Sequence, residues 1–370
     1  MSRVISACAN VVLVVCSIAL TVLGLEAFLW VTASTHTVHA SPPASVIAPP
    51  PPASSIHKVV IPPDILAAAR SRQDVISMPE SWKRRATTVA GAVRANYWHG
   101  VLHVYNSDGM RWARPFPDKQ EDVYRIIVVG DSLTYGDGLA AEGRFTNLLN
   151  QWLNQQYRIE VLNLGIDGRQ SEDVLRLTRR YLPILKPDLV VYSVCLNDFL
   201  PSGRGQYSDN AAYPFPAPEA LKNAFIRHTR AGAFLSEQYD AALRRLHLRA
   251  DFFDDILADF DGYQLRFASD VAEMNRVVRA AGLPPLVGMV IDQFPIYGQR
   301  GYRIAKIAES ALATAGAEVI ETEDYYRRYH GHSMNISRWE GHPNEVANFI
   351  WASMLSSGLR GRPDLQAFRR

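Results

Sequence analysis

The sequence predicts an α/β fold: a three-layer α/β/α sandwich with a parallel sheet, preceded by one transmembrane helix. Two observations support this prediction. From residue 124 onward, short apolar runs alternate with amphipathic helical patterns, which is typical of parallel strands joined by crossover helices. Before that, a nearly continuous apolar run covers Val4–Val31, and a run of this length is long enough to span a bilayer.

The N-terminal run has one carboxylate, Glu26, and follows Arg3. Because basic residues favour the cytoplasmic side, we expect residues 1–35 to form a single-pass signal-anchor helix in the inner (cytoplasmic) membrane. The remainder of the chain would then lie on the periplasmic, extracytoplasmic side. A signal peptide cleaved after Ala40 is the alternative.

Three further regions follow along the chain. Residues 36–66 are rich in proline and predict an extended linker. Residues 67–122 form a lead-in segment that we expect to pack on the next domain. In its aromatic part, Asn96–Pro117, the alternation at Val101–Tyr105 and a turn signal at residues 106–109 favour an extended segment or hairpin. A structural role and a role in lining a substrate groove both remain open.

Residues 123–370 predict the α/β domain. An interruption at about residues 201–283 predicts a helical insertion, and such insertions commonly shape substrate specificity. Elsewhere the apolar runs and periodicities predict strands and helices in alternation. The strands are expected at Ile126–Val129, Arg158–Leu164, Leu189–Val194, Leu286–Ile291 and Glu318–Glu321, and the helices at Phe145–Gln156, Ser171–Leu185, Gly301–Ala315 and Asn344–Ser357.

A serine stands at the end of the first predicted strand, in Gly130-Asp131-Ser132. Its hydroxyl would lie at the open edge of the sheet, and the helix after it would offer main-chain N–H groups to an oxyanion. A serine nucleophile also needs a base, and His342, placed just before Pro343 on a predicted loop, can supply one. Polar loops at residues 163–168 and 196–199 follow two further strands.

Taken in order, these four segments resemble the four blocks of the SGNH (GDSL-type) hydrolases, which are serine esterases and lipases. The blocks are GDSLTYG, NLGIDG, CLNDF and EGHPN, and the similarity extends over Tyr124–Ser357. For this chain the resemblance implies a membrane-anchored bacterial-type member with a flavodoxin-like sandwich. It also implies Ser132 as nucleophile, His342 as base, and an oxyanion hole made of the Ser132 and Gly168 main-chain N–H groups and the Asn197 side chain.

Two positions depart from the family pattern. Cys195 stands where the third block usually has glycine, and Trp339 stands where the last block usually has an aspartate. We assign Glu340 to orient His342 in place of that aspartate; the alternative is a site that works as a Ser–His dyad. Cys195 itself, at the end of a predicted strand, is interpreted as a buried thiol.

Other classes of function fit less well. A net charge of +2 gives no field that would favour nucleic acid. The pair His330 and His332 lacks the partners of a zinc site, and we expect neither a metal nor a cofactor. The sequence therefore predicts a membrane-anchored esterase whose ester substrate is an O-acetyl group of an envelope carbohydrate, an acetylated glycan. The alternatives are an acyltransferase that uses the same Ser/His site on an exported polysaccharide, and a non-catalytic envelope protein that keeps the fold.

Overall fold

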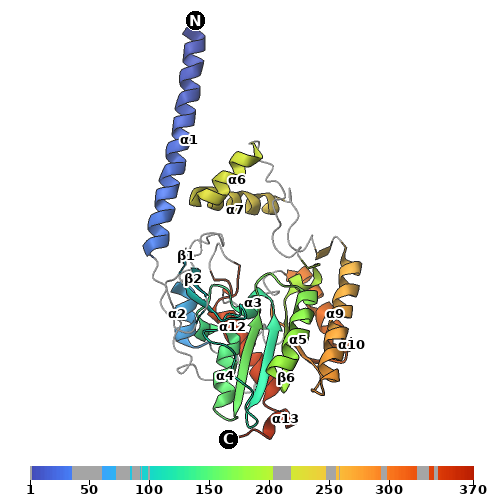
Figure 1. Ribbon diagram of the computed structural model, residues 1–370. Coiled ribbons are helices and arrows are strands. Elements are labelled where there is room, and N and C mark those ends of the chain that lie inside the picture. The colour runs from blue at the N-terminus through green and yellow to red at the C-terminus, as the bar shows by residue number, and fades with distance from the viewer. Residues whose placement is uncertain are drawn as a thin grey trace.

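A five-stranded parallel sheet forms the centre of the protein (Figure 1). The structure is a computed structural model, and it describes residues 2–35, 61–71, 84–85, 92, 94–98, 101–202, 218–246, 256–257, 259–292, 298–322, 333–336 and 341–370. The sheet order is β5-β4-β6-β7-β8. These strands are β4 (Tyr124–Gly130), β5 (Ile159–Gly165), β6 (Leu189–Val194), β7 (Val287–Val290) and β8 (Glu318–Ile320).

Helices cover both faces of this sheet. In Figure 1, α4 (Phe145–Asn154) and α12 (Glu345–Leu359) lie on one side, while α5 (Ser171–Leu185), α9 (Phe260–Ala280) and α10 (Gly298–Thr314) lie on the other. The predicted α/β fold with a parallel sheet is confirmed. Because β4 stands between β5 and β6, the winding of the chain reverses at β4. Ligands of open α/β sheets bind beyond the carboxyl ends of the strands at such a switch point.

The core explains why these segments form these elements. Every residue of β4 and of β6 is buried, as expected for strands that are covered on both faces. On the α12 side, two pairs of aromatic rings meet edge to face between helices. Phe145 contacts Trp351 at a centroid distance of 5.9 Å, and Trp152 contacts Phe349 at 5.5 Å. These pairs fix α12 against α4.

The segment expected as an insertion, residues 201–283, divides into two parts. Helix α9 is a layer of the sandwich, and its buried apolar residues recur at helical spacing: Tyr263, Phe267, Val271, Met274 and Val278. Helices α6 (Glu219–His228) and α7 (Arg230–Arg245) instead lie beside the N-terminal helix α1 (Ser2–Thr35) (Figure 1). Glu26 Oε2 accepts a hydrogen bond from Ala231 N at 2.7 Å, and Arg230 Nη1 donates to Leu29 O at 3.2 Å.

The predicted transmembrane helix falls within α1. Among the residues that the structure describes, no helix is both long enough and apolar enough to cross a membrane.

The lead-in segment adds a second, antiparallel sheet and one helix. Its strands are β1 (Arg84–Arg85), β2 (Arg94–Trp98) and β3 (Val101–Tyr105), in the order β1-β2-β3. The turn predicted at residues 106–109 leads out of β3, and Asn106 Oδ1 accepts from the main-chain N–H groups of residues 108 and 110, each at 3.0 Å. Helix α2 (Pro63–Ser71) packs on α12, and its first residues fall within 36–66, where the sequence predicts an extended linker. The lead-in is therefore joined to the core of the domain.

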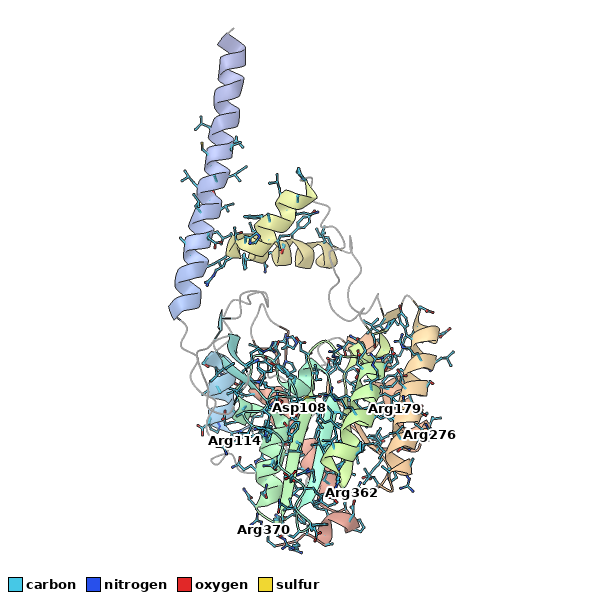
Figure 2. The ribbon with its side chains drawn as sticks, in the orientation of Figure 1. Asp108, Arg114, Arg179, Arg276, Arg362 and Arg370 are labelled. Carbon is cyan, nitrogen blue, oxygen red and sulfur yellow. The ribbon has the colours of Figure 1, made fainter. Side chains whose placement is uncertain are left out.

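The chain ends beside the amino-terminal ends of the strands, at the opposite end of the sheet from α6 and α7. Figure 2 shows Arg362 and Arg370 there, around the short helix α13 (Pro363–Gln366). The Arg362 guanidinium pairs with Glu318 and Asp364, and Arg370 Nε donates to Tyr157 O at 3.1 Å. The C-terminal tail thus covers the ends of the sheet at which the strands begin. It does not cover the carboxyl ends of the strands.

Candidate active site

Ser132 is the first residue of the short helix α3 (Ser132–Tyr135), which follows directly after the end of β4. Asp131 caps this helix, since its Oδ1 accepts from Leu133 N at 2.9 Å. The Ser132 hydroxyl lies 3.5 Å from Asp131 Oδ2, and only 4% of the residue is exposed. The helix ends at Gly136, whose φ of 74° is one that glycine adopts without strain. The serine therefore occupies the strand–turn–helix position that the sequence predicts.

Two glycines allow α3 to sit directly on the sheet. A Cβ atom on Gly130 would lie 2.2 Å from Thr134 Oγ1, and one on Gly165 would lie 2.2 Å from Tyr135 N. Both distances are far below van der Waals contact, so any side chain at either position would push α3 away from the strand ends. The glycines that end β4 and β5 thereby fix the height of Ser132 above the sheet.

Gly168 lies on the loop that follows β5. Ile166 N donates to Gly130 O at 3.2 Å, so this loop begins level with the segment that carries Ser132. Gly168 has a φ of 72°, in the left-handed region where a residue with a side chain would be strained. Its main-chain N–H therefore lies, like Ser132, beyond the carboxyl ends of the strands.

Asn197 lies on a short 3₁₀ helix, η4 (Leu196–Phe199), directly after β6. Two buried carboxylates hold the start of this element. Asp198 Oδ2 accepts from Cys195 N at 2.9 Å, while Asp292 Oδ2 accepts from Leu196 N at 3.0 Å and from the Cys195 thiol at 3.2 Å. The φ of Cys195 is −101°, which suits any residue, so the glycine usual at this position is not needed for the backbone.

The other end of η4 packs on α9. The ring of Phe199 stacks on that of Phe267 at a centroid distance of 4.4 Å, and the Arg266 guanidinium donates to Phe199 O. Within the part of the chain that the structure describes, Asn197 Oδ1 has no hydrogen-bond partner. Asn197 is thus held on a rigid element. The unpartnered atom is an acceptor, so Nδ2, on the side of the amide that hydrogen-bonds to Asp131, is the group able to donate to an oxyanion.

Burial dominates the electrostatics beneath the site. It raises the pKa of Asp131 to about 6, against the hydrogen bond from Leu133 N, which lowers it. Burial, followed by the nearby Asp131 charge, raises the pKa of Asp198 well above its ordinary value. Burial likewise raises the pKa of the Cys195 thiol. The thiol therefore stays protonated as a donor to Asp292 and is no candidate for a nucleophile.

His342 lies on the loop before α12. Its carbonyl oxygen accepts from Ile336 N at 2.8 Å, and Asn344 N donates to Met334 O at 2.7 Å. Asn348, in the first turns of α12, accepts from Phe145 N at 3.0 Å, which ties this region to the chain that follows Ser132. Glu340, predicted to orient His342, lies outside the described residues.

A sequence model of the GDSL-like Lipase/Acylhydrolase family matches residues 128–348 of this chain. The chain belongs to this family. The match covers all four predicted blocks and confirms the resemblance noted in the sequence. Family membership supports a hydrolase that acts on ester bonds.

Solved structures of lipases and esterases also match parts of this chain. A lipase/acylhydrolase from Enterococcus faecalis is 14% identical with a TM-score of 0.38, and the alignment covers 65% of this chain and 96% of that one. The esterase EstA from a Pseudoalteromonas species is 17% identical, at a TM-score of 0.37 and coverages of 62% and 93%. An acetylxylan esterase from Geobacillus stearothermophilus is 14% identical, at a TM-score of 0.40 and coverages of 65% and 97%. No curated protein sequence matches this chain.

Sequence patterns did not identify two buried residues that lie near the GDSL-family blocks. Asp292, which braces the Asn197 element, directly follows the predicted strand Leu286–Ile291, and a polar residue at that position was an available signal. Arg111 contacts the loop after Ser132. It comes from the lead-in segment, before the family match begins, and no local pattern marks it.

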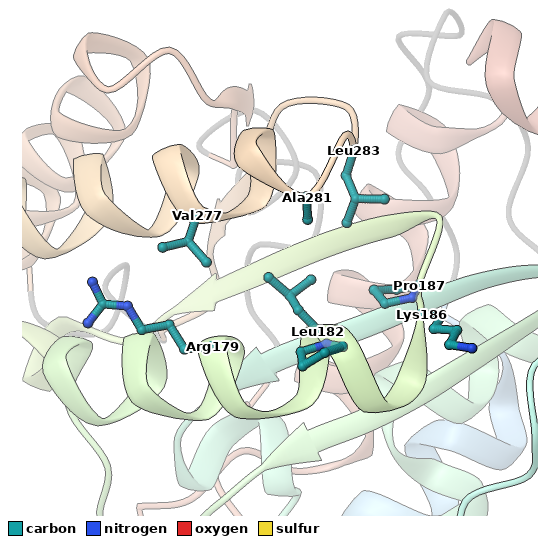
Figure 3. A pocket seen from close by; sticks show the side chains of 8 residues that line it. Arg179, Leu182, Lys186, Pro187, Val277, Ala281 and Leu283 are labelled. Atoms are coloured by element: carbon teal, nitrogen blue, oxygen red, sulfur yellow. The ribbon is translucent and has the colours of Figure 1, made fainter.

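A separate groove of about 550 Å³ lies between α5 and α9 (Figure 3). Arg179 and Lys186 stand at its rim over apolar residues that include Leu182, Val277 and Leu283. Lys186 ends α5 just before β6 begins, so the groove lies toward the amino-terminal edge of the strands. It is therefore not part of the GDSL-family site at the carboxyl edge.

Proposed function

We propose that this chain is a serine esterase that removes acetyl groups from an envelope carbohydrate. One observation supports the site above all others. Ser132, Gly168 and Asn197 each follow the carboxyl end of one of three adjacent strands, β4, β5 and β6, around the switch point of the sheet. A hydroxyl, a main-chain N–H and a side-chain amide on one sheet edge are the groups that acyl transfer from an ester requires.

The proposed reaction has two halves. His342 removes the proton of the Ser132 hydroxyl as Oγ attacks the ester carbonyl carbon. The N–H groups of Ser132 and Gly168 and the Asn197 amide bind the resulting oxyanion. The C–O bond to the alcohol then breaks, and the alcohol leaves with the proton from His342. A water molecule, deprotonated by His342, attacks the acyl-enzyme, which releases the carboxylic acid and restores Ser132.

The group that orients His342 is also part of the proposal. Glu340, two residues before His342, is the nearest acid in sequence and is assigned this role. In the alternative, a Ser–His dyad, a main-chain carbonyl orients the imidazole and the acid contributes little. Both versions share the same nucleophile and base.

A small acyl group fits the surroundings of the nucleophile. Ser132 is 4% exposed, so little of its surface can be approached without rearrangement. An acetyl group requires the least room among the common acyl groups, and we therefore expect turnover to fall as the acyl chain lengthens.

Placement at the inner membrane through residues 1–35, with the domain on the extracytoplasmic side, is a further proposal. It is supported by the length of the apolar run and by Arg3 before it. The full-length chain should then sediment with membranes and resist carbonate extraction. A mature protein that begins at Ser41 would contradict an uncleaved anchor and leave the catalytic proposal intact.

The test of the activity uses purified full-length protein with p-nitrophenyl acetate and with acetylated polysaccharide. Ser132→Ala should reduce turnover by at least about a thousandfold. Ser353→Ala is the matched control, because Ser353 is a buried serine of α12 whose hydroxyl donates to Phe349 O. It should keep turnover within about twofold of the wild type. Acetate release that requires an acceptor glycan would favour acyl transfer by the same residues, and wild-type turnover in Ser132→Ala would contradict the proposal.

A further inference from the structure

The loop that follows the nucleophile helix holds the main chain of Ser132. The carbonyl oxygen of Ser132 accepts from Gly136 N at 2.9 Å and from Asp137 N at 3.3 Å, and Leu139 N closes the next turn on Gly136 O at 3.2 Å. Any shift of residues 136–139, the post-nucleophile loop, would therefore move the peptide group that follows Ser132. The peptide group before Ser132 is held by Tyr135, whose N–H donates to Asp131 O at 2.9 Å.

The carbonyl groups of this region point toward the lead-in segment and meet a single side chain there. The guanidinium of Arg111 donates to Tyr135 O at 3.3 Å, and also to Gly136 O and Leu139 O. A guanidinium carries five N–H donors in a rigid planar fork, whereas a lysine ammonium has three on a flexible stem. Arginine is thus suited to bind three carbonyl groups that converge from different residues.

Arg111 is itself enclosed and fixed. It is 4% exposed, its guanidinium lies 5.3 Å from the centre of the Tyr135 ring, and its carbonyl oxygen accepts from Arg144 Nη1 at 3.2 Å. The side chain of Arg144 also fills the space beside Gly136, where a Cβ would lie 2.6 Å from Arg144 Cγ. Arg111 therefore connects the lead-in segment rigidly to the post-nucleophile loop.

We propose that Arg111 is a positioning residue that holds the post-nucleophile loop and, through it, the Ser132 peptide in the geometry needed for attack and for oxyanion binding. The kinetic consequence rests on the proposed function. Arg111 lies before residue 128, where the family match begins, so this chain supplies the support from its own lead-in segment. A misplacement of reacting groups by about 1 Å can cost roughly a hundredfold in rate.

A second buried arginine of the same domain provides a matched control. Arg125 is 1% exposed and also binds carbonyl groups, donating to Leu185 O at 2.7 Å and to Pro117 O at 2.9 Å. It stands at the start of β4, at the opposite end of that strand from Ser132. Loss of Arg125 therefore removes a comparable buried arginine without touching the post-nucleophile loop.

The first measurement is steady-state kinetics on the folded full-length chain, with Arg111→Met and Arg111→Lys beside Arg125→Met and Arg125→Lys. Arg111→Met should lower kcat by about a hundredfold while KM changes less than about threefold. Arg111→Lys should have a kcat less than about tenfold above that of Arg111→Met, because lysine restores the positive charge without the planar guanidinium. If a Met variant does not fold, the comparison of kcat between Arg111→Lys and Arg125→Lys tests the proposal. A folded Arg111 variant with kcat near the wild type, or an equal kcat loss in the matching Arg125 variant, would overturn the proposal.

The second measurement does not depend on activity. Amide hydrogen exchange over residues 132–139 should accelerate in the Arg111 variants by at least about tenfold more than exchange over β6, and in the Arg125 variants it should not. If the wild-type chain shows no esterase activity, the proposed function fails, and this exchange comparison still decides the role of Arg111. Equal acceleration in both segments would overturn that role.

Discussion

The side-chain amide of Asn163 donates to the main-chain carbonyl of Thr134 over 2.6 Å and so joins β5 to the helix that carries Ser132. The same amide donates to Thr146 Oγ1 at 2.9 Å, and Asn163 Oδ1 accepts from Gly165 N at 2.9 Å. Asn163 is buried. The first residue of the second family block thus acts on the main chain around Ser132, in the same region that Arg111 holds from the other side.

Replacement of Asn163 by alanine should destabilise the protein. Asn163→Ala leaves Thr134 O and Gly165 N buried without these partners, and we expect a loss of about 3 kcal/mol in the free energy of unfolding. Asn154→Ala is the control, because Asn154 is half-buried on α4 and donates to Asn150 O within its own helix. It should cost no more than about 0.5 kcal/mol. Urea unfolding followed by circular dichroism measures both, and equal losses would refute the assigned role of Asn163.

Asn344 combines two tasks that substitution can separate. Its Oδ1 caps α12 by accepting from Val346 N at 2.9 Å, and its Nδ2 donates to Ser333 O at 2.9 Å and to Asn335 O at 3.0 Å, which fixes the His342 loop. Asn344→Ser keeps a capping oxygen and should be about 1 kcal/mol more stable than Asn344→Ala. Both variants lose the loop contacts, so kcat for p-nitrophenyl acetate should fall in both. Wild-type turnover in Asn344→Ser would show that these contacts do not position His342.

The buried Asp131 predicts a specific pH dependence of stability. Its pKa is raised from 3.8 to about 6 in the folded chain, chiefly by burial. Between these pH values the folded chain keeps a proton that the unfolded chain has released. The resulting contribution to the free energy of unfolding is therefore full below about pH 4 and is lost as the pH rises through 6. It amounts to about 3 kcal/mol.

Asp131→Asn removes this titration. Urea unfolding of wild type and variant at about pH 5 and about pH 7.5 should show that the wild type loses more stability than the variant as the pH rises. An identical pH dependence in the two proteins would contradict the raised pKa.

Glu340 tests the triad against the dyad. If its carboxylate orients His342, Glu340→Gln should reduce kcat by orders of magnitude, as loss of the orienting acid does in other serine hydrolases. A loss below about tenfold, equivalent to about 1.4 kcal/mol in the activation free energy, would instead favour the dyad. The kinetic assay with p-nitrophenyl acetate distinguishes these outcomes.

The central elements could be predicted from the sequence because local signals agree there. The predicted helix at residues 171–185 and strand at 189–194 match α5 and β6 at both ends. The helical periodicity of α5 ends at Lys186 and Pro187, and the apolar run of β6 begins directly after Asp188. Other boundaries moved by a few residues, as for α10, which begins at Gly298 instead of Gly301.

What sequence patterns could not supply are contacts between residues far apart in the chain. The bonds from Arg111 to Leu139 and from Asn163 to Thr134 join side chains to main-chain carbonyls of other elements, and such pairs leave no periodic signal. Helix α9 is different, because it falls within residues 201–283, which the sequence predicts as a helical insertion. Its packing on α5 and α10 made it a sandwich layer.

Covalent labelling of the nucleophile tests the central claim most directly. The full-length chain is incubated with a fluorophosphonate, which phosphonylates a serine hydroxyl only when a neighbouring base and oxyanion-binding groups activate it, and the modified peptide is located by mass spectrometry. We predict one phosphonyl group per chain, on Ser132, with labelling lost in His342→Ala and unchanged in Ser353→Ala. An unmodified Ser132 in the folded wild-type chain, or equal labelling after removal of His342, would contradict the account.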